Sequence, residues 1–274
     1  MAGRPDEVDP GAAQQRTRLR SARDGDVMEL TLCNGPEGVL DDSLVCELAA
    51  AVGQIERLER PRRPRVLLLS GEVPGVFVRR YAVDELLAGA AAGDEPHALQ
   101  RLIARLESLE LVTVAALHGT TLGGGFELAL GCDFRLASEG PYRFGLRETE
   151  VGLVPGAGGT QRLVREIGVA KTLELVLLSK LLKPQEALAL GLLHHVFERE
   201  EFAVRVSAFC VDIARRAPIA LALAKRVIRQ GAELPLAEAL LLEQRASAAS
   251  ARTEDARNAV EAYGQGRSHV FRGR

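Results

Sequence analysis

Two glycine-rich segments, each followed by a helical pattern, contain the residues of this chain best suited to chemistry. The first runs from Gly123 to Gly125 and leads directly to Glu127. A glycine run before a helix lets a ligand approach bare backbone N–H groups, and a helix N-terminus favours negative charge. A carboxylate beside such a run can exchange a proton with the ligand. The structural alternative is a tight strand-to-helix turn in which Glu127 is merely favoured by the helix dipole.

The second segment runs from Gly152 to Gly159 and follows Glu148. Its composition invites a comparison with phosphate-binding loops. It lacks the Gly-Lys-Ser/Thr ending of such a loop, however, and Gln161 stands where the third glycine of a dinucleotide fingerprint would be. We therefore expect no nucleotide loop here. For Glu148 taken alone, the structural alternative is a solvated loop acid.

Strand and helix patterns alternate in the first half of the chain, where they can position the first segment. Apolar alternation and buried apolar runs predict strands at Val27–Leu32, Val66–Ser70 and Val112–Leu117. Apolar residues at helical spacing predict helices over Leu44–Leu58 and Leu99–Leu109. The later chain is mostly helical, with prolines where new helices can begin, at Pro184, Pro218 and Pro235. The sequence thus predicts an α/β protein with its sheet in the first half of the chain.

The composition is that of an ordinary globular protein, with 274 residues of which 47% are apolar and 26% charged. A formal charge of −2 and a pI near 6.3 give no whole-chain reason to expect nucleic acid, which usually binds to a basic face. The 4 cysteines form no CxxC pair and have no nearby histidine cluster, so we expect buried free thiols and no metal site. No signal segment or run of membrane-spanning length is present, so we expect no membrane association and a cytoplasmic location.

Three regions are expected along the chain. Residues 1–22 are predicted to form a flexible tail, because they carry arginines without an apolar core. Their acidic residues, Asp6, Glu7 and Asp9, argue against a matrix-targeting leader. Residues 23–199 are predicted to form the core with the active site, and residues 200–274 a helical C-terminal region. A chain of this length can form one large domain, or a core with a small C-terminal subdomain.

Three stretches are specific when taken together: Val114–Asp133, Phe144–Glu148 and Gly152–Leu163. They resemble the crotonase (enoyl-CoA hydratase/isomerase) superfamily, most closely its two-glutamate hydratases. The resemblance runs from about Val27 to the C-terminus. It implies a crotonase-like spiral of ββα turns, followed by a helical C-terminal region that packs trimers, commonly paired into hexamers. It also implies an acyl-CoA thioester substrate, with coenzyme A as part of the substrate and no separate cofactor.

The resemblance assigns roles residue by residue. Gly124 matches the glycine whose N–H forms half of an oxyanion hole, and Gly123 lies beside it in the substrate-binding turn. Glu127 and Glu148 match the two catalytic carboxylates of hydratases. The match of Glu148 depends on its spacing to the second glycine-rich segment, and Glu150 would replace it if the alignment were shifted.

The chemistry of water addition requires these residue types. Attack on a conjugated thioester places negative charge on the thioester oxygen, which fixed N–H donors stabilise in the transition state. The water must lose a proton as it attacks Cβ, and Cα must gain one, so two carboxylates can act as base and acid. Nearby, His118 and Asp133 are expected to be structural.

One segment, Phe77–Asp84, departs from the family pattern, which has small residues such as Ala-Gly-Ala-Asp after a phenylalanine. Tyr81 aligns with the second oxyanion donor, and any non-proline residue can supply that N–H. We expect Arg79 or Arg80 to bind an anionic group of the CoA or of the acyl chain, because guanidinium groups pair well with phosphate and carboxylate. The alternative is that both arginines face solvent.

Three functions stay open at this point. The chain is expected to add water to a 2-enoyl-CoA, or to perform another CoA-enolate reaction (isomerisation, decarboxylation or thioester hydrolysis), or to be a CoA-binding assembly protein without activity. The pair of Glu127 and Glu148 favours the hydratase, whereas the altered segment Phe77–Asp84 favours the others.

Overall fold

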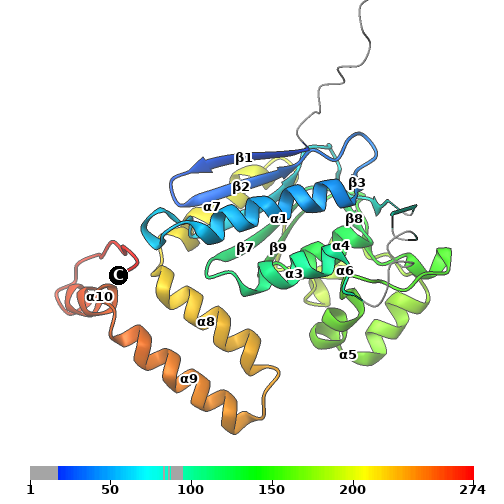
Figure 1. The fold of residues 1–274 in the computed structure, drawn as a ribbon. Coiled ribbons are helices and arrows are strands. Elements are labelled where there is room, and N and C mark those ends of the chain that lie inside the picture. The colour runs from blue at the N-terminus through cyan, green and yellow to red at the C-terminus, as the bar shows by residue number, and fades with distance from the viewer. Residues whose placement is uncertain (1–17, 83, 86, 88–94) are drawn as a thin grey trace, which may run out of the picture.

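The computed structural model describes residues 18–82, 84, 85, 87 and 95–274. Its centre is a 6-stranded sheet in the order β1-β2-β4-β7-β9-β11 (Figure 1). The strands are β1 (Leu19–Asp24), β2 (Val27–Leu32), β4 (Val66–Gly71), β7 (Val112–Leu117), β9 (Phe134–Ser138) and β11 (His195–Phe197). Neighbouring strands are parallel except β1 and β2, which are antiparallel. Parallel neighbours need crossover connections, which are supplied by the turns of a spiral.

Each turn of the spiral contributes a long strand, a short strand and a helix. The short strands are β3 (Val39–Leu40), β5 (Val76–Val78), β6 (Arg80–Tyr81), β8 (Thr120–Leu122) and β10 (Phe144–Gly145). The helices of the spiral are α1 (Asp42–Arg57), α3 (Ala98–Ser108), α4 (Gly124–Leu130) and α5 (Gly159–Leu177). Strands β10, β8 and β5 form a second sheet, and β3 pairs with β6. This arrangement confirms the α/β class and the crotonase-like ββα spiral core.

Apolar layers cover both faces of the large sheet. On one face, α1 packs against α3, and Leu48 of α1 is fully buried in the larger core cluster. On the other face, α7 (Phe202–Ala214) packs Val206 into a second cluster with Val114 of β7. Every residue of β7 is buried, as expected for a parallel strand covered by helices on both sides.

The chain beyond the spiral is helical apart from β11, which confirms the predicted helical C-terminal region. Besides α7, its helices are α6 (Pro184–Ala189), α8 (Pro218–Gly231), α9 (Leu236–Ala251) and α10 (Glu254–Gly264). The prolines predicted to start helices do so, since α6 and α8 begin at a proline and α9 begins directly after Pro235. Helices α8 and α9 form a pair that extends away from the sheet (Figure 1).

Two expectations about the strands were wrong. The tail predicted over residues 1–22 includes β1, which pairs with β2 from Leu19 to Asp24, while residues 1–17 lie outside the described residues. The sheet also extends past the first half of the chain, because β11 pairs with β9. Strand β1 is held by backbone hydrogen bonds and is largely exposed, so it lacks the apolar alternation by which strands are recognised.

Candidate active site

The Glu127 carboxylate is held inside the protein by backbone donors. Glu127 lies in the first turn of α4 and is only 3% exposed. Its Oε1 accepts hydrogen bonds from the N–H groups of Ala157 and Gly159, both at 2.8 Å. These donors come from the N-terminus of α5, where free N–H groups favour a negative charge. The second glycine-rich segment therefore supplies the backbone donors that hold the carboxylate of Glu127, which follows the first glycine-rich segment.

The geometry of this donor segment requires glycine at positions 158 and 159. A Cβ on Gly159 would lie 2.9 Å from Glu127 Cγ, closer than side chains approach one another. Gly158 has a φ of +97°, in the left-handed region that favours glycine. The chain can therefore turn into α5 while its N–H groups point at Glu127.

Glu148 lies against the first glycine-rich segment. It opens a short 3-10 helix, Glu148–Val151, and is half-buried. A Cβ on Gly123 would lie 3.0 Å from Glu148 Oε1. Its Oε2 is buried, and no group within residues 18–82, 84, 85, 87 and 95–274 hydrogen-bonds to it. An unpaired buried carboxylate oxygen is costly and is typical of a group that awaits a ligand.

Burial raises the pKa of both carboxyl groups. The pKa of Glu127 is raised to about 7, chiefly by burial and also by the charge of Glu148, against the opposing hydrogen bonds of Gly159 and Ala157 and the charge of Arg162. Burial also raises the pKa of Glu148. Because the two groups interact, their titration belongs to the pair. Near neutral pH such a pair can hold one proton, so that one member is an acid and the other a base.

The side chain of Tyr81 packs against the backbone of Gly124. A Cβ on Gly124 would lie 3.1 Å from Tyr81 Cδ2 and 3.6 Å from Tyr81 Cβ. On either side of Tyr81, the N–H groups of Arg79 and Ala82 donate to Gly38 O and Leu40 O, both at 2.8 Å. The two predicted oxyanion donors are therefore neighbours.

The Tyr81 side chain is buried by packing against α1. Its hydroxyl donates to Asp42 Oδ1 at 2.5 Å, and its ring meets the His97 ring edge-on at 5.1 Å. Burial and the Asp42 carboxylate both raise the pKa of Tyr81, so the phenol stays protonated. The bulk that distinguishes this segment from the family pattern is thus accommodated beside α1.

Arg79 and Arg80 are both exposed. Arg80 forms an ion pair with Glu37 at 2.6 Å. Within the part of the chain that the structure describes, no hydrogen bond or ion pair joins either arginine to Glu127 or Glu148. The structure therefore brings together the two carboxyls and the glycine turn, but leaves these arginines at the surface.

Sequence reasoning missed the partners of the predicted residues. The donors Ala157 and Gly159 belong to a segment that was identified, but a backbone donor carries no side-chain signal. The exposed carboxylate of Glu150 is already paired with Arg147, which favours Glu148 as the second carboxylate of the site. His118 contacts Val73 O at 2.7 Å, in keeping with a structural role.

Neither a metal nor a membrane is indicated by the described residues. They contain no group of three or more His, Cys, Asp or Glu side chains arranged to hold a metal ion. None of the helices formed by these residues has both the length and the apolar character needed to span a bilayer.

Known proteins share this fold and much of this sequence. The chain is 33% identical over 225 residues to the mitochondrial methylglutaconyl-CoA hydratase of Rattus norvegicus, which covers 80% of this chain and 71% of that protein. It is 34% identical over 272 residues to the mitochondrial enoyl-CoA hydratase domain-containing protein 2 of Homo sapiens, covering 96% and 91% of the two chains.

A solved structure agrees with these relatives. The crystal structure of enoyl-CoA hydratase from Bacillus anthracis superimposes with a TM-score of 0.86 and 29% identity, over 94% of this chain and 100% of that one. The family described as Enoyl-CoA hydratase/isomerase matches residues 23–274, which include both glycine-rich segments and both carboxyl groups. The chain therefore belongs to the enoyl-CoA hydratase/isomerase family.

Proposed function

We propose that this protein adds water across the double bond of a 2-enoyl-CoA. The observation that carries the proposal is the pair of carboxyl groups beside the Gly123–Gly125 turn: Glu127, which is buried, and Glu148, which is half-buried and lies against Gly123. A reaction with both a base step and an acid step uses both members of such a pair. Coenzyme A enters as part of the substrate, and we propose no separate cofactor.

The thioester oxygen is proposed to accept hydrogen bonds from the N–H groups of Gly124 and Tyr81. Negative charge grows on this oxygen as water attacks Cβ, so fixed donors stabilise the transition state more than the substrate. Gly123 has a φ of +54°, a backbone conformation that a glycine adopts readily, and this turn presents the N–H of Gly124 at the start of α4.

The proton steps are proposed to use the single proton shared by Glu127 and Glu148. The ionised member takes a proton from the attacking water, and the hydroxyl forms a bond to Cβ. The double-bond electrons move to Cα and the thioester oxygen. The protonated member then supplies its proton to Cα. The raised pKa of Glu127, about 7, keeps both states accessible near neutral pH.

The reaction can be tested by product identification. The purified protein is incubated with 2-enoyl, 3-enoyl, malonyl-type, 3-hydroxyacyl and 3-methylglutaconyl thioesters of CoA, and products are identified by mass. Gain of one water by a 2-enoyl-CoA, and the reverse from its 3-hydroxyacyl-CoA, would support hydration. If only a shift of the double bond, decarboxylation or thioester cleavage occurs, the alternative enolate reactions replace it. If thioesters bind without turnover, the chain is a binding protein.

Arg79 and Arg80 are proposed to bind an anionic group of the substrate. Arg80 has a partner in Glu37 at 2.6 Å, so its charge is partly neutralised, and the exposed Arg79 is the better candidate. Replacing each by alanine separates the possibilities. A contact with CoA phosphates would raise KM for every thioester, whereas an acyl contact would raise it only for acidic acyl groups. Unchanged KM and kcat for both substrate classes at low salt would exclude a ligand role.

We also propose that the chain assembles as a homotrimer or hexamer. Helices α9 and α10 expose large apolar side chains, among them Leu236, Leu240 and Tyr263. Apolar side chains gathered at a surface favour association with another protein surface. Light scattering coupled to size-exclusion chromatography should give three or six times the chain mass, and a monomer at micromolar concentration would contradict this. The cytoplasmic location also stays a proposal, which cell fractionation would test.

A further inference from the structure

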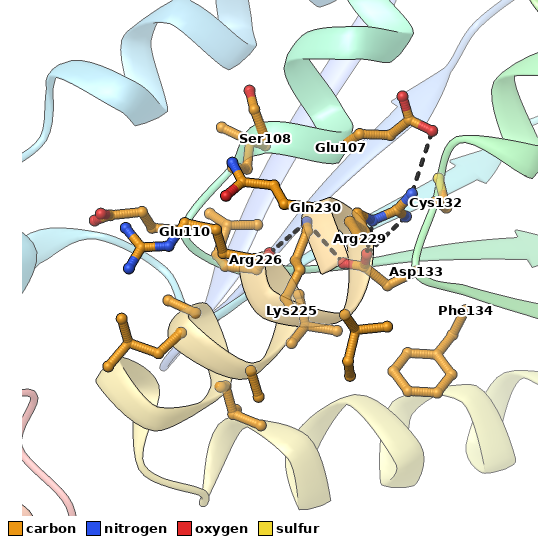
Figure 2. A pocket seen from close by; sticks show the side chains of 18 of the residues that line it. Glu107, Ser108, Glu110, Cys132, Asp133, Phe134, Lys225, Arg226, Arg229 and Gln230 are labelled. Carbon is orange, nitrogen blue, oxygen red and sulfur yellow. Dashed lines mark hydrogen bonds and ion pairs between the residues drawn. The ribbon is translucent and has the colours of Figure 1, made fainter. Parts of the chain in front are cut away.

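A chain of ion pairs leads from the C-terminal helices to the segment that holds Glu127. Arg162 of α5 makes a two-pronged pair with Glu107 at the end of α3, with Nε–Oε1 at 2.8 Å and Nη2–Oε2 at 2.7 Å. Arg229 of α8 also contacts Glu107 Oε1, at 3.2 Å. Figure 2 shows Arg229 lying between Glu107 and Asp133, which it binds at 2.8 Å.

Arg162 also contacts the peptide segment that orients Glu127. Its Nη1 donates to Ala157 O at 2.9 Å, and the N–H of the same residue, Ala157, donates to Glu127 Oε1 at 2.8 Å. The guanidinium lies so close to the turn that a Cβ on Gly158 would collide with Arg162 Nη1. Both backbone polar groups of Ala157 are therefore hydrogen-bonded, its carbonyl to Arg162 and its N–H to Glu127.

Arg162 lines a groove beside the C-terminal helices. A groove of about 1600 Å³ lies between α8 and the body of the protein, and its lining includes Gly158, Arg162 and Arg229 but neither Glu127 nor Glu148. Arg162 therefore contacts the 157–159 segment from within this groove.

We propose that Arg162 is a positioning residue for Glu127, held in place by Glu107, which Arg229 in turn holds from α8. The inference deepens the proposed hydration and rests on it for its kinetic part. If this inference holds, the geometry of the site depends on the contact between α8 of the C-terminal region and α3 of the spiral core. A shift of one ångström in a proton-transfer group can cost roughly 10²-fold in rate, so a modest movement of the 157–159 segment would be measurable.

The burial of the pair supports this role. The side chains of Arg162 and Glu107 are 16% and 23% exposed, so solvent screens them less than a surface pair. Arg165, one turn further along α5, forms a pair with Glu233 that is 54% and 56% exposed. It also joins α5 to the C-terminal region, but it contacts no part of the 157–159 segment among the described residues. Arg165 is therefore a matched control.

The kinetic test compares Arg162→Ala, Arg162→Lys and Arg165→Ala. Arg162→Ala should lower kcat by roughly 10–10² while KM changes little, because Glu127 is misplaced and the binding surface is intact. Arg162→Lys keeps a charge but loses the two-pronged geometry, so partial activity is expected. Arg165→Ala should match wild type. The double variant Arg162→Ala with Glu107→Gln should cost about as much as Arg162→Ala alone, since both act through one contact.

A second readout does not depend on turnover. The carboxyl titration of Glu127 can be followed by infrared spectroscopy of protein labelled with 13C-glutamate, with the signal assigned by its loss in Glu127→Gln. The charged groups acting on Glu127 are Glu148 and Arg162, and the charge of Arg162 opposes the rise in pKa. The pKa should therefore rise in Arg162→Ala and stay unchanged in Arg165→Ala.

These readouts separate the two ideas. If wild type hydrates no thioester but the Glu127 titration moves in Arg162→Lys, which keeps the charge, as well as in Arg162→Ala, and not in Arg165→Ala, the proposed function fails and the positioning role stands. If wild type is active and Arg162→Ala matches Arg165→Ala in kcat and in the titration, the positioning role is wrong. Should Arg162→Ala fail to fold by circular dichroism, Arg162→Lys and Glu107→Gln are measured instead. Wild-type kcat and titration in both would equally overturn the inference.

Discussion

The carboxylate of Glu148 lies directly against the backbone of Gly123, since a Cβ on that glycine would lie 3.0 Å from Glu148 Oε1. The turn that starts α4 and the second carboxyl group thus occupy space that only a glycine leaves free. Gly123 also has a φ of +54°, which side chains rarely adopt.

Gly123→Ala should therefore lower hydration by at least roughly 10²-fold, because the new methyl group displaces Glu148 and strains the oxyanion turn. The matched control is Gly25→Ala between β1 and β2, where φ is +55° and nothing lies within 4 Å of the added Cβ. Both variants should lose about 1–3 kcal/mol of unfolding free energy, because a positive φ strains a residue that carries a side chain. Only Gly123→Ala should lose activity. Equal activity in the two would mean that the contact with Glu148 is unimportant.

Glu127→Gln and Glu148→Gln should each lower kcat by roughly 10²–10⁴ and leave KM for the thioester nearly unchanged, because an amide cannot transfer the proton but fills the same space. The control is Glu150→Gln, whose exposed side chain pairs with Arg147 outside the site. Steady-state kinetics on the best 2-enoyl-CoA would decide this. Wild-type turnover in either Glu127→Gln or Glu148→Gln would contradict the two-carboxyl mechanism.

The raised pKa of Glu127 should make the protein less stable as the pH rises. Its ordinary pKa of 4.5 becomes about 7 in the folded state, so between these values the folded protein binds more protons than the unfolded chain. Unfolding free energy then falls with pH across this window, by up to about 3 kcal/mol. The loss is absent below the window and complete above it.

Glu127→Gln removes this penalty, because an amide resembles the protonated acid. The variant should be more stable than wild type at pH 8 and similar to it at pH 5, as measured by urea unfolding. For Glu150→Gln, which keeps Glu127, the difference in unfolding free energy from wild type should be the same at pH 5 and pH 8. The same difference from wild type at both pH values would show that burial of this carboxylate is not costly.

Tyr81→Phe should separate the side chain of Tyr81 from its backbone. The change removes the hydroxyl that donates to Asp42 at 2.5 Å but keeps the N–H proposed to bind the thioester oxygen. We expect a loss of about 1–2 kcal/mol in unfolding free energy, with kcat and KM close to wild type. Thermal unfolding and kinetics on the same preparation would measure both. A large fall in kcat with normal stability would instead place the phenol in the chemistry.

The parts of the fold predicted from the sequence are those with long apolar patterns. Strand β7 and helix α3 occur within a residue or so of their predicted bounds. An unbroken buried run marks β7, and apolar residues at helical spacing mark α3. Strands β8 and β10, which flank the active site, have only 3 and 2 residues, too few for any pattern. The short strands therefore came from the family resemblance alone.

The sequence predicted the residues of the site but not the contacts that hold those residues in place. Glu127 and Glu148 were selected by matching motifs, and the structure places both beside the same glycine turn. The N–H of Ala157 reaches Glu127 across 30 residues of chain, and the pairing of Arg162 with Glu107 spans 55. Contacts of this range depend on how the spiral closes, which local sequence does not determine.

The antiparallel strand β1 has a consequence for aggregation. A parallel sheet ends in unpaired N–H and C=O groups that can recruit a strand from another molecule. Here the outer position belongs to β1, an exposed strand that carries Arg20, Arg23 and Asp24. A strand approaching that edge would have to bury these charges. At the opposite edge, β11 is only 3 residues long and offers little to pair with. Among the residues that the structure describes, both edges of the sheet therefore disfavour the addition of a further strand.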